Sequence, residues 1–195
     1  MRLRLICLLL FVVVMSPAWA QRANPYSIEI DLQEQRAYLI EDGAIVLAAP
    51  ISSGRGGHYT TPGTFKIIEK ELNHFSNMYG KIVDARGRTL VADADSETRV
   101  PRGGRFAPAP MRYFMRFNGA EGMHAGFLPG RPASHGCVRL PEEDAIALFE
   151  TVPVGTPVTV FGNTATYENS RQSGRGPQFT RRAEPIYRVP PAQWR

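Results

Sequence analysis

The sequence predicts a mainly β fold on three observations. The 18 glycines and 16 prolines make up 34 of the 195 residues, and so many turn-forming residues favour short strands over long helices. Near the start of the chain, Ile28, Ile30 and Leu32 alternate with charged residues, and this period of two indicates a half-buried strand. Helix signals are confined to residues 141–149.

The first elements form a three-stranded meander over residues 26–51. Its last two strands are joined by Asp42-Gly43, which is a strong hairpin signal. A glycine-rich loop at 52–57 and a turn at Thr61-Pro62-Gly63 follow. The expected strands, in chain order, are residues 26–32, 36–41, 44–51, 64–69, 111–117 and 157–161.

Residues 71–110 give no regular pattern. They mix short apolar groups with Arg, Asp and Gly and end in a proline-rich stretch. We expect an irregular segment, and within a folded domain such a segment is often a binding loop or lid. Residues 74–110 are therefore expected to form a lid or one wall of a cleft.

One short helix is expected from Pro141 to Phe149. Proline suits the first helical position, where its missing N–H has no partner to lose. Glu142, Glu143 and Asp144 follow it, and acidic residues stabilise the positive end of the helix dipole.

Composition and charge limit the function classes. The chain is 43% hydrophobic, which is enough for a core and excludes a wholly disordered protein. Its net charge of +5 is carried by the two ends, because residues 21–162 hold 15 basic against 16 acidic side chains. The body therefore lacks the positive surface that nucleic-acid binding needs. Residues 163–195, with 6 Arg against 2 Glu and few large aliphatic residues, are expected to be a basic, disordered tail.

Residues 1–20 have the pattern of a cleaved signal peptide. Arg2 and Arg4 precede an apolar run from Leu5 to Met15, and Ala18-Trp19-Ala20 follows. The run is shorter than the ~20 residues of a membrane-spanning helix, so an uncleaved anchor is the weaker alternative. We expect cleavage after Ala20, export to the periplasm or cell envelope, and no stable membrane span afterwards.

Export makes Cys137 the only cysteine of the mature chain. A leftover cysteine in an oxidising compartment indicates intermolecular pairing or a reactive thiol, and an inert buried thiol is the alternative. Nucleophilic catalysis needs a base and oxyanion donors beside the sulfur. His124 or His135 could be the base, and Gly136 allows backbone amides to approach a substrate carbonyl.

Three other interpretations use the same residues. His124, His135 and Cys137 could bind zinc, although the usual paired spacing is missing. The cysteine and histidines could be purely structural. A serine nucleophile at Ser134 or in the Ser52-Ser53 pair lacks the nucleophile-elbow pattern. His58 and His74 lie in expected loops and are predicted to face solvent.

Ser134-His135-Gly136-Cys137-Val138-Arg139, with His124 upstream, resembles the signature of the L,D-transpeptidase catalytic (YkuD-like) family. The resemblance extends over residues 26–162. It includes the opening meander, the turn and strand at 61–65, the strand 111–117, the Pro141 helix and the segment 154–158.

The resemblance implies a β-sandwich of two mixed sheets, with one short helix after the catalytic cysteine. It assigns residues 21–162 to a catalytic domain that forms 3→3 cross-links between peptidoglycan tetrapeptide stems. Cys137 would attack the stem, D-Ala would leave, and an amine would resolve the thioester. His124 would be the base, oriented by the backbone carbonyl after it.

The resemblance also assigns the residues around the nucleophile. The amides of Gly136 and Cys137 would hold the oxyanion, His135 and Ser134 would shape the turn, and Tyr113 would line the groove. The spacer between the base and this motif is short, and Arg139 stands where Asn is common. We expect Arg139 or Arg131 to pair with a stem carboxylate.

The implied partners are peptidoglycan stem peptides or a wall-anchored protein, with no cofactor, no metal and no nucleic acid. The sequence leaves three alternative functions open. The first is a hydrolase of the same fold, in which water resolves the thioester. The others are a non-catalytic wall-binding module and a zinc hydrolase. The basic tail could hold the enzyme near anionic envelope polymers.

Overall fold

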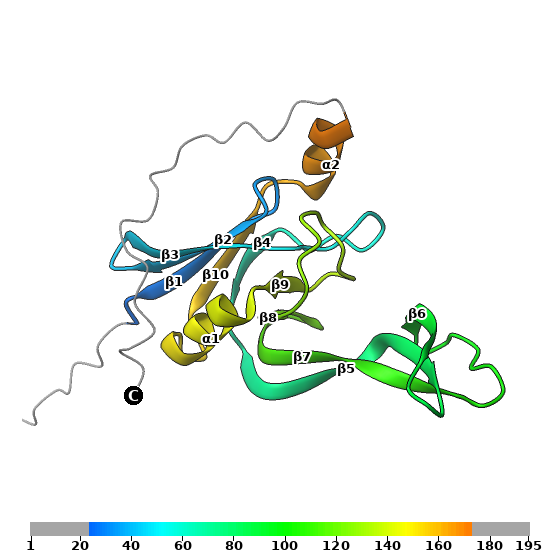
Figure 1. Ribbon diagram of the computed structural model, residues 1–195. Helices are drawn as coiled ribbons and strands as arrows, with labels where there is room; N and C mark the ends of the chain where they lie inside the picture. The colour runs from blue at the N-terminus through cyan, green and yellow to red at the C-terminus, as the bar shows by residue number, and fades with distance from the viewer. Residues whose placement is uncertain (1–23, 173–195) are drawn as a thin grey trace, which may run out of the picture.

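Two five-stranded sheets make up most of residues 24–172, the part of the chain that the computed structural model describes (Figure 1). Sheet A has the order β3-β2-β1-β10-β4, and sheet B has the order β6-β5-β7-β8-β9. The strands are β1 Tyr26–Asp31, β2 Arg36–Glu41, β3 Ala44–Pro50, β4 Gly63–Lys66, β5 Glu69–Asp84, β6 Thr89–Asp95, β7 Gly104–Asn118, β8 Glu121–Ala125, β9 Val138–Leu140 and β10 Pro157–Phe161.

Both sheets are mixed, as predicted. In sheet A, β1 pairs in parallel with β10 and antiparallel with β2. In sheet B, β8 pairs in parallel with β9 and antiparallel with β7. The fold class predicted from the alternation and from the family resemblance is therefore confirmed.

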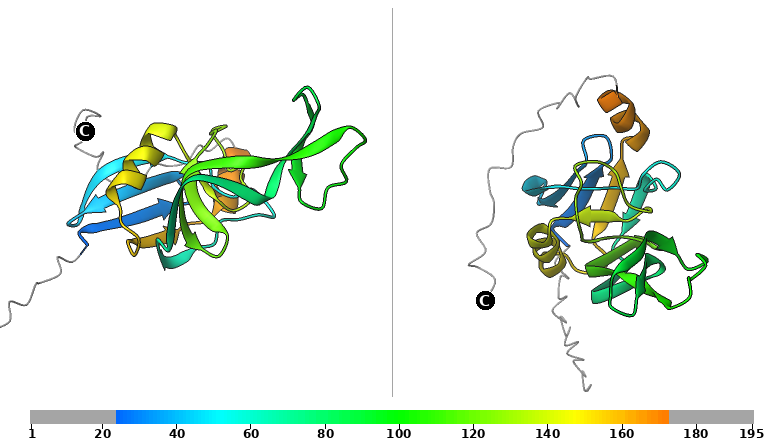
Figure 2. Two further views of the ribbon diagram at one scale, coloured as in Figure 1. Left: turned by 90° about the horizontal axis from the view of Figure 1, so that it is seen from below. Right: turned by 45° about the vertical axis from the view of Figure 1, so that its right-hand side comes forward.

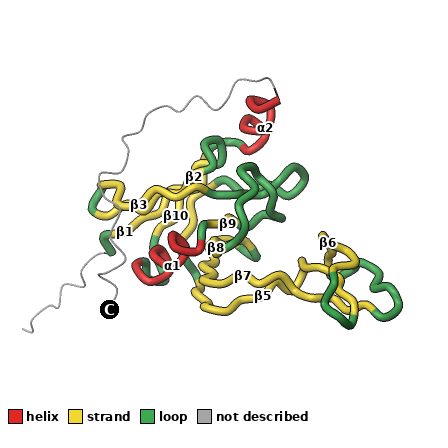
Figure 3. The backbone as a smooth tube through the Cα atoms, viewed as in Figure 1, coloured by secondary structure: helices red, strands yellow, loops and turns green. Residues whose placement is uncertain are grey.

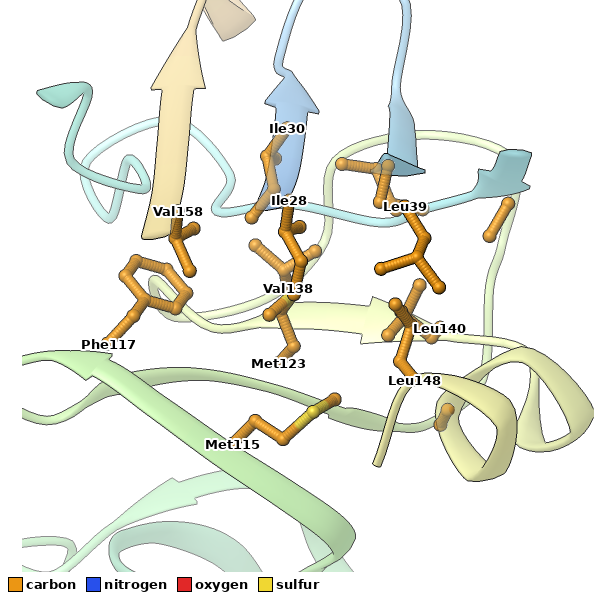
Figure 4. Packing of buried hydrophobic residues seen from close by; sticks show 14 of the residues in the cluster. Ile28, Ile30, Leu39, Met115, Phe117, Met123, Val138, Leu140, Leu148 and Val158 are labelled. Atoms are coloured by element: carbon orange, nitrogen blue, oxygen red, sulfur yellow. The ribbon is translucent and has the colours of Figure 1, made fainter. Parts of the chain in front are cut away.

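The core lies between the inner faces of the two sheets. Figure 4 shows Ile28 and Val158 of sheet A directed toward Val138 and Met123 of sheet B, and Ile28, Met123, Val138 and Val158 have no exposed surface. Leu148 from the helix closes one side of the cluster. Because each such side chain contributes roughly 1.5–3 kcal/mol when buried, this layer fixes which face of each strand points inward.

Helix α1, Glu142–Thr151, follows β9 and begins one residue later than predicted. Pro141 has an extended ψ of 146° and is the residue that precedes the helix, not its first turn. Its carbonyl accepts the first helical hydrogen bond, from the Ala145 N–H at 2.9 Å. The three acidic residues of the first turn are as expected.

The prediction of an irregular segment over 71–110 is wrong. Most of it belongs to β5, β6 and β7, and the distal parts of these strands form an arm that extends away from the rest of the protein (Figure 2). A register shift between Phe75 and Gly80 divides β5, and exposed side chains lie along both faces of the arm. A few apolar residues of the arm, Ile82, Val83 and Ala94, are buried, but they lie outside the main core cluster and do not alternate regularly with polar residues.

The start of the expected disordered tail is a helix. Helix α2, Thr164–Gln172, follows β10 (Figure 3). The buried Tyr167 donates a hydrogen bond to the Gly130 carbonyl at 2.8 Å, and the Thr164 hydroxyl lies 3.4 Å from that of Ser53. These contacts order a polar segment that composition alone indicates as disordered.

The N-terminal 20 residues and the part of the basic tail after residue 172 lie outside the described residues. Over residues 24–172, no helix is both long enough and apolar enough to span a membrane.

Candidate active site

The parallel pair β8–β9 brings the two main candidate residues to one region. His124 lies on β8, and Cys137 immediately precedes β9. Met123 pairs with Val138, and both are buried in the core. Side chains alternate along a strand, so His124 and its register partner Arg139 project from the opposite face of sheet B.

The ring of His124 is held as the tautomer whose Nε2 can accept a proton. Its Nδ1 lies 2.8 Å from the carbonyl oxygen of Ala125. A carbonyl can only accept, so Nδ1 carries the proton and Nε2 is left free of one. Burial lowers the pKa of His124 to about 4, and the positive charges of Arg139 and His74 add to this effect. The ring is therefore neutral at pH 7, with the carbonyl partner that the family resemblance implies.

Cys137 is a partly buried free thiol. Its Sγ lies 3.8 Å from the Ala120 carbonyl. Burial raises the pKa of the Cys137 thiol, and the Glu121 carboxylate raises it further, while the amide of Gly122 and the charges of Arg116 and Arg139 oppose this. A thiol that resists ionisation needs a base when it attacks.

Ser134 and Thr60 fix the turn before the nucleophile. The hydroxyl of Ser134 donates to the Cys137 carbonyl and accepts the Gly136 N–H at 3.1 Å. Thr60, which is fully buried, donates to the Gly136 carbonyl at 2.7 Å. Gly136 has a φ of 117°, a conformation that requires glycine. The Gly136 N–H donates to the Ser134 hydroxyl, so this amide does not have the expected role of an oxyanion donor in the structure.

His135 faces the arm. Its Nε2 lies 2.7 Å from Nη2 of Arg55, and the same guanidinium nitrogen donates to Oδ2 of Asp93, on β6, at 2.9 Å. The His135 ring stacks on the Tyr79 ring of β5, with 3.9 Å between the ring centroids, and the His58 ring packs edge-on against it. We call Arg55, Tyr79, Asp93 and His135 the arm latch.

The arm latch decides between the two candidate bases. A guanidinium only donates, so Nε2 of His135 is an acceptor committed to Arg55. Burial and Arg55 lower the pKa of His135, and Asp93, whose Oδ1 lies 3.3 Å from Nε2, partly opposes this. His124 is therefore the histidine whose unprotonated nitrogen is available for chemistry.

The Asp93→Asn substitution is expected to loosen the arm without unfolding the domain. Asp93 is well exposed, and an exposed ion pair contributes about 0–1 kcal/mol to stability. Amide hydrogen exchange over residues 89–95 should become faster, while the melting temperature changes little. Glu97→Gln, a charge removal beyond β6 and outside the arm latch, is the control. Unchanged exchange in the Asp93 variant would contradict the latch.

The three other candidate binding residues occupy different places. Arg139 is half-buried beside His124, and its aliphatic stem covers Gly126, where a Cβ would lie 3.1 Å from Cγ of the arginine. Arg131 is exposed, and its backbone carbonyl accepts a hydrogen bond from Ser52. Tyr113 packs against Phe149 of α1 and the core cluster. Its contacts are thus structural, in contrast to the predicted place in the groove.

His74 is not the solvent-facing residue that was predicted. It lies on β5, stacks on the fully buried Phe114 at 4.2 Å, and its Nδ1 lies 2.6 Å from a Glu71 carboxylate oxygen. The Phe114 ring in turn lies 6.4 Å from that of His124. His74 and Phe114 therefore form the floor beneath the base. His58 is exposed, as predicted.

Glu121 is the residue near Cys137 that sequence patterns do not reveal. Its carboxylate accepts hydrogen bonds from the backbone and hydroxyl of Thr61 and from the Asn118 amide at 3.0–3.3 Å. It is the first residue of β8 and pairs with Asn118 of β7, and no period or motif marks it. Among residues 24–172, no three His, Cys, Asp or Glu side chains are grouped in a way that could hold a metal ion.

A two-sheet β domain with a thiol and a neutral histidine at adjacent parallel strands has the architecture of an L,D-transpeptidase catalytic domain. Residues 25–160 match the YkuD family model, described as the L,D-transpeptidase catalytic domain, and the chain belongs to this family.

Known relatives agree with this assignment. Probable L,D-transpeptidase YbiS from Escherichia coli K12 is 52% identical over 136 residues, covering 67% of this chain and 43% of the relative. The crystal structure of an L,D-transpeptidase from Stackebrandtia nassauensis has a TM-score of 0.54 and 26% identity, covering 78% of this chain and 63% of that one. A mutant L,D-transpeptidase from Enterococcus faecium has a TM-score of 0.52 and 26% identity, covering 70% and 50%. The chain thus spans less than half the length of YbiS.

Proposed function

We propose that this chain is an exported L,D-transpeptidase that joins peptidoglycan tetrapeptide stems by 3→3 cross-links. The observation that carries the proposal is the neutral His124, oriented by the Ala125 carbonyl, on the strand beside the Cys137 thiol. Family membership supports the reaction class. Export rests on the signal-peptide pattern of residues 1–20.

The first half of the reaction forms a thioester. His124 Nε2 takes the proton of the Cys137 thiol as Sγ attacks the carbonyl of the third stem residue. The Cys137 N–H is the amide we assign to the oxyanion, since the Gly136 N–H is held by Ser134. The C–N bond to D-Ala then breaks, and the proton on His124 passes to the leaving amine.

The second half consumes the thioester. The amine of another stem attacks the same carbonyl, the C–S bond breaks, and the Cys137 sulfur recovers a proton through His124. A hydrolase would use water in this step with the same residues, giving a tripeptide, and a wall-anchored protein would offer a different acceptor. The chemistry of the acceptor therefore defines the activity.

Mass spectrometry of the products tests this proposal. The mature protein is incubated with a disaccharide-tetrapeptide, and released D-Ala and muropeptides are quantified. A cross-linked dimer is the expected product. D-Ala with tripeptide alone would replace transpeptidation by carboxypeptidase activity, and the absence of any product would contradict catalysis on stems.

Arg139 is proposed to bind a carboxylate of the donor stem. It is half-buried beside His124, and a charge-assisted hydrogen bond contributes roughly 1.5–3 kcal/mol. Arg139→Ala should raise KM for the stem about tenfold, and Arg139→Lys should recover part of the loss. Arg131→Ala, at the exposed arginine, is the comparison. An unchanged KM in the Arg139 variants, with a raised KM in Arg131→Ala, would move the role to Arg131.

A further inference from the structure

A carboxylate stands beside the nucleophile, although it makes the thiol harder to ionise. The Ala120 carbonyl, on the residue before Glu121, is 3.8 Å from Cys137 Sγ. A Cβ built on Gly136 would lie 3.5 Å from Oε1 of Glu121. The carboxylate therefore borders Gly136 and lies next to the nucleophile Cys137.

Neutral groups hold this carboxylate in place. Its hydrogen-bond donors are the Thr61 N–H, which is shared between both oxygens, the Thr61 hydroxyl and the Asn118 amide. Over residues 24–172, no salt bridge includes Glu121, so no cation of this part of the chain is paired with its charge. A carboxylate has about four acceptor positions, which leaves capacity for a cationic ligand.

The charges on the two sides of Cys137 have opposite sign. Arg139 follows the nucleophile on β9, and Glu121 borders it from the start of β8. Arg139 lowers the pKa of the thiol and Glu121 raises it. A donor stem brings a carboxylate, which suits the arginine side. An acceptor amine arrives as an ammonium group, which suits the glutamate side, whereas water carries no charge that could pair with either residue.

We propose that Glu121 binds the ammonium group of the acceptor and so favours an amine over water for resolving the thioester. The inference rests on the proposed function and names the specificity residue of its second step. The bound ammonium loses one proton to solvent, and the free amine attacks the thioester carbonyl. The C–S bond breaks, and the second proton passes through His124 to the Cys137 sulfur, so atoms and charge balance.

The substitution Glu121→Gln tests this with two acceptors. With the disaccharide-tetrapeptide, the ratio of cross-linked dimer to hydrolysed tripeptide should fall about tenfold, as expected for the loss of one charge-assisted contact. With hydroxylamine, which attacks thioesters as an uncharged nucleophile at pH 7, the ratio of hydroxamate to tripeptide should stay within twofold. Glu150→Gln, at an exposed site on α1, is the control and should change neither ratio.

A purely structural role of Glu121 predicts a different result. If the carboxylate only ties Thr61 to the start of β8, D-Ala release and hydroxylamine capture should fall together with dimer formation, and this outcome would overturn the proposal. Glu121→Asp, which keeps the charge and the acceptor oxygens, provides a milder variant with an expected intermediate ratio.

Salt dependence tests the proposal without relying on a variant that must fold. In the wild type, raising the ionic strength should lower the dimer-to-tripeptide ratio, because exposed charge pairs are screened by salt, while hydroxylamine capture stays constant. A salt-independent ratio overturns the role of Glu121. Absence of D-Ala release from the wild type would instead refute the proposed function, so the two failures are distinguishable.

Discussion

Cys137→Ala is expected to reduce D-Ala release and cross-linking to background. Cys137 carries the protein's nucleophile in the proposed mechanism, and removing such a group from a covalent catalytic unit can cost on the order of 10⁶ in kcat. Incubation with the disaccharide-tetrapeptide, followed by intact-protein mass spectrometry, should show an acyl adduct on the wild type and none on the variant.

Cys137→Ser separates the chemistry of sulfur from its position. A serine hydroxyl is far less acidic than a thiol, and the neutral His124, with a pKa of about 4, is too weak a base to activate it well. We expect activity near that of the alanine variant and a melting temperature close to the wild-type value. D-Ala release that persists in Cys137→Ala would refute the mechanism.

The sequence predicts the five strands of sheet A and, in sheet B, only the inner part of β7. The short strands β8 and β9 also border the core but are too short to show a period, and they are not predicted. Ile28 and Val158 are buried, and their alternation with polar neighbours follows from that burial. The sequence of the arm shows no such alternation. Its pairing of β5 with β7 is a relation between distant segments, made through backbone hydrogen bonds that depend little on which side chains are present.

The same distinction separates the site residues. His124 and Cys137 could be found because the turn around the nucleophile is local, with Ser134 and Gly136 in one short motif. Thr60 and Glu121 reach that turn only through the fold. The role of His135 was open for the same reason, since its partners Arg55 and Asp93 come from remote segments.

His124→Gln should lower the rate of thioester formation by about 10² to 10⁴-fold, the usual contribution of a positioned general base. Glutamine is close to histidine in size and can still donate to the Ala125 carbonyl, but its amide does not accept a proton at neutral pH. D-Ala release in a single turnover is the direct measure, and an unchanged melting temperature at pH 7.5 is the control. A loss of less than threefold would show that another group takes the thiol proton.

The pH dependence gives a sharper test of His124. Because its pKa is about 4 rather than the ordinary 6.5, the base form persists through mildly acidic conditions. The acidic limb of kcat/KM for D-Ala release should therefore be centred near pH 4 and should be absent in His124→Gln. A limb near pH 6.5 would show that the ring ionises as an exposed histidine does, in contradiction to its burial beside Arg139 and Phe114.

The free energy of unfolding should fall as the pH drops through the range in which His124 ionises. The folded pKa of His124, about 4, lies below the unfolded value of 6.5, so between these values the unfolded chain binds the proton first. The stabilisation is complete above pH 6.5 and is lost as the pH falls toward 4, by roughly 3 kcal/mol in total. Urea unfolding at several pH values should show this loss in the wild type and a shallower one in His124→Gln. Equal slopes would mean that the buried ring is not the group that ties folding to protonation, and the low pKa that leaves it unprotonated at neutral pH would have no support.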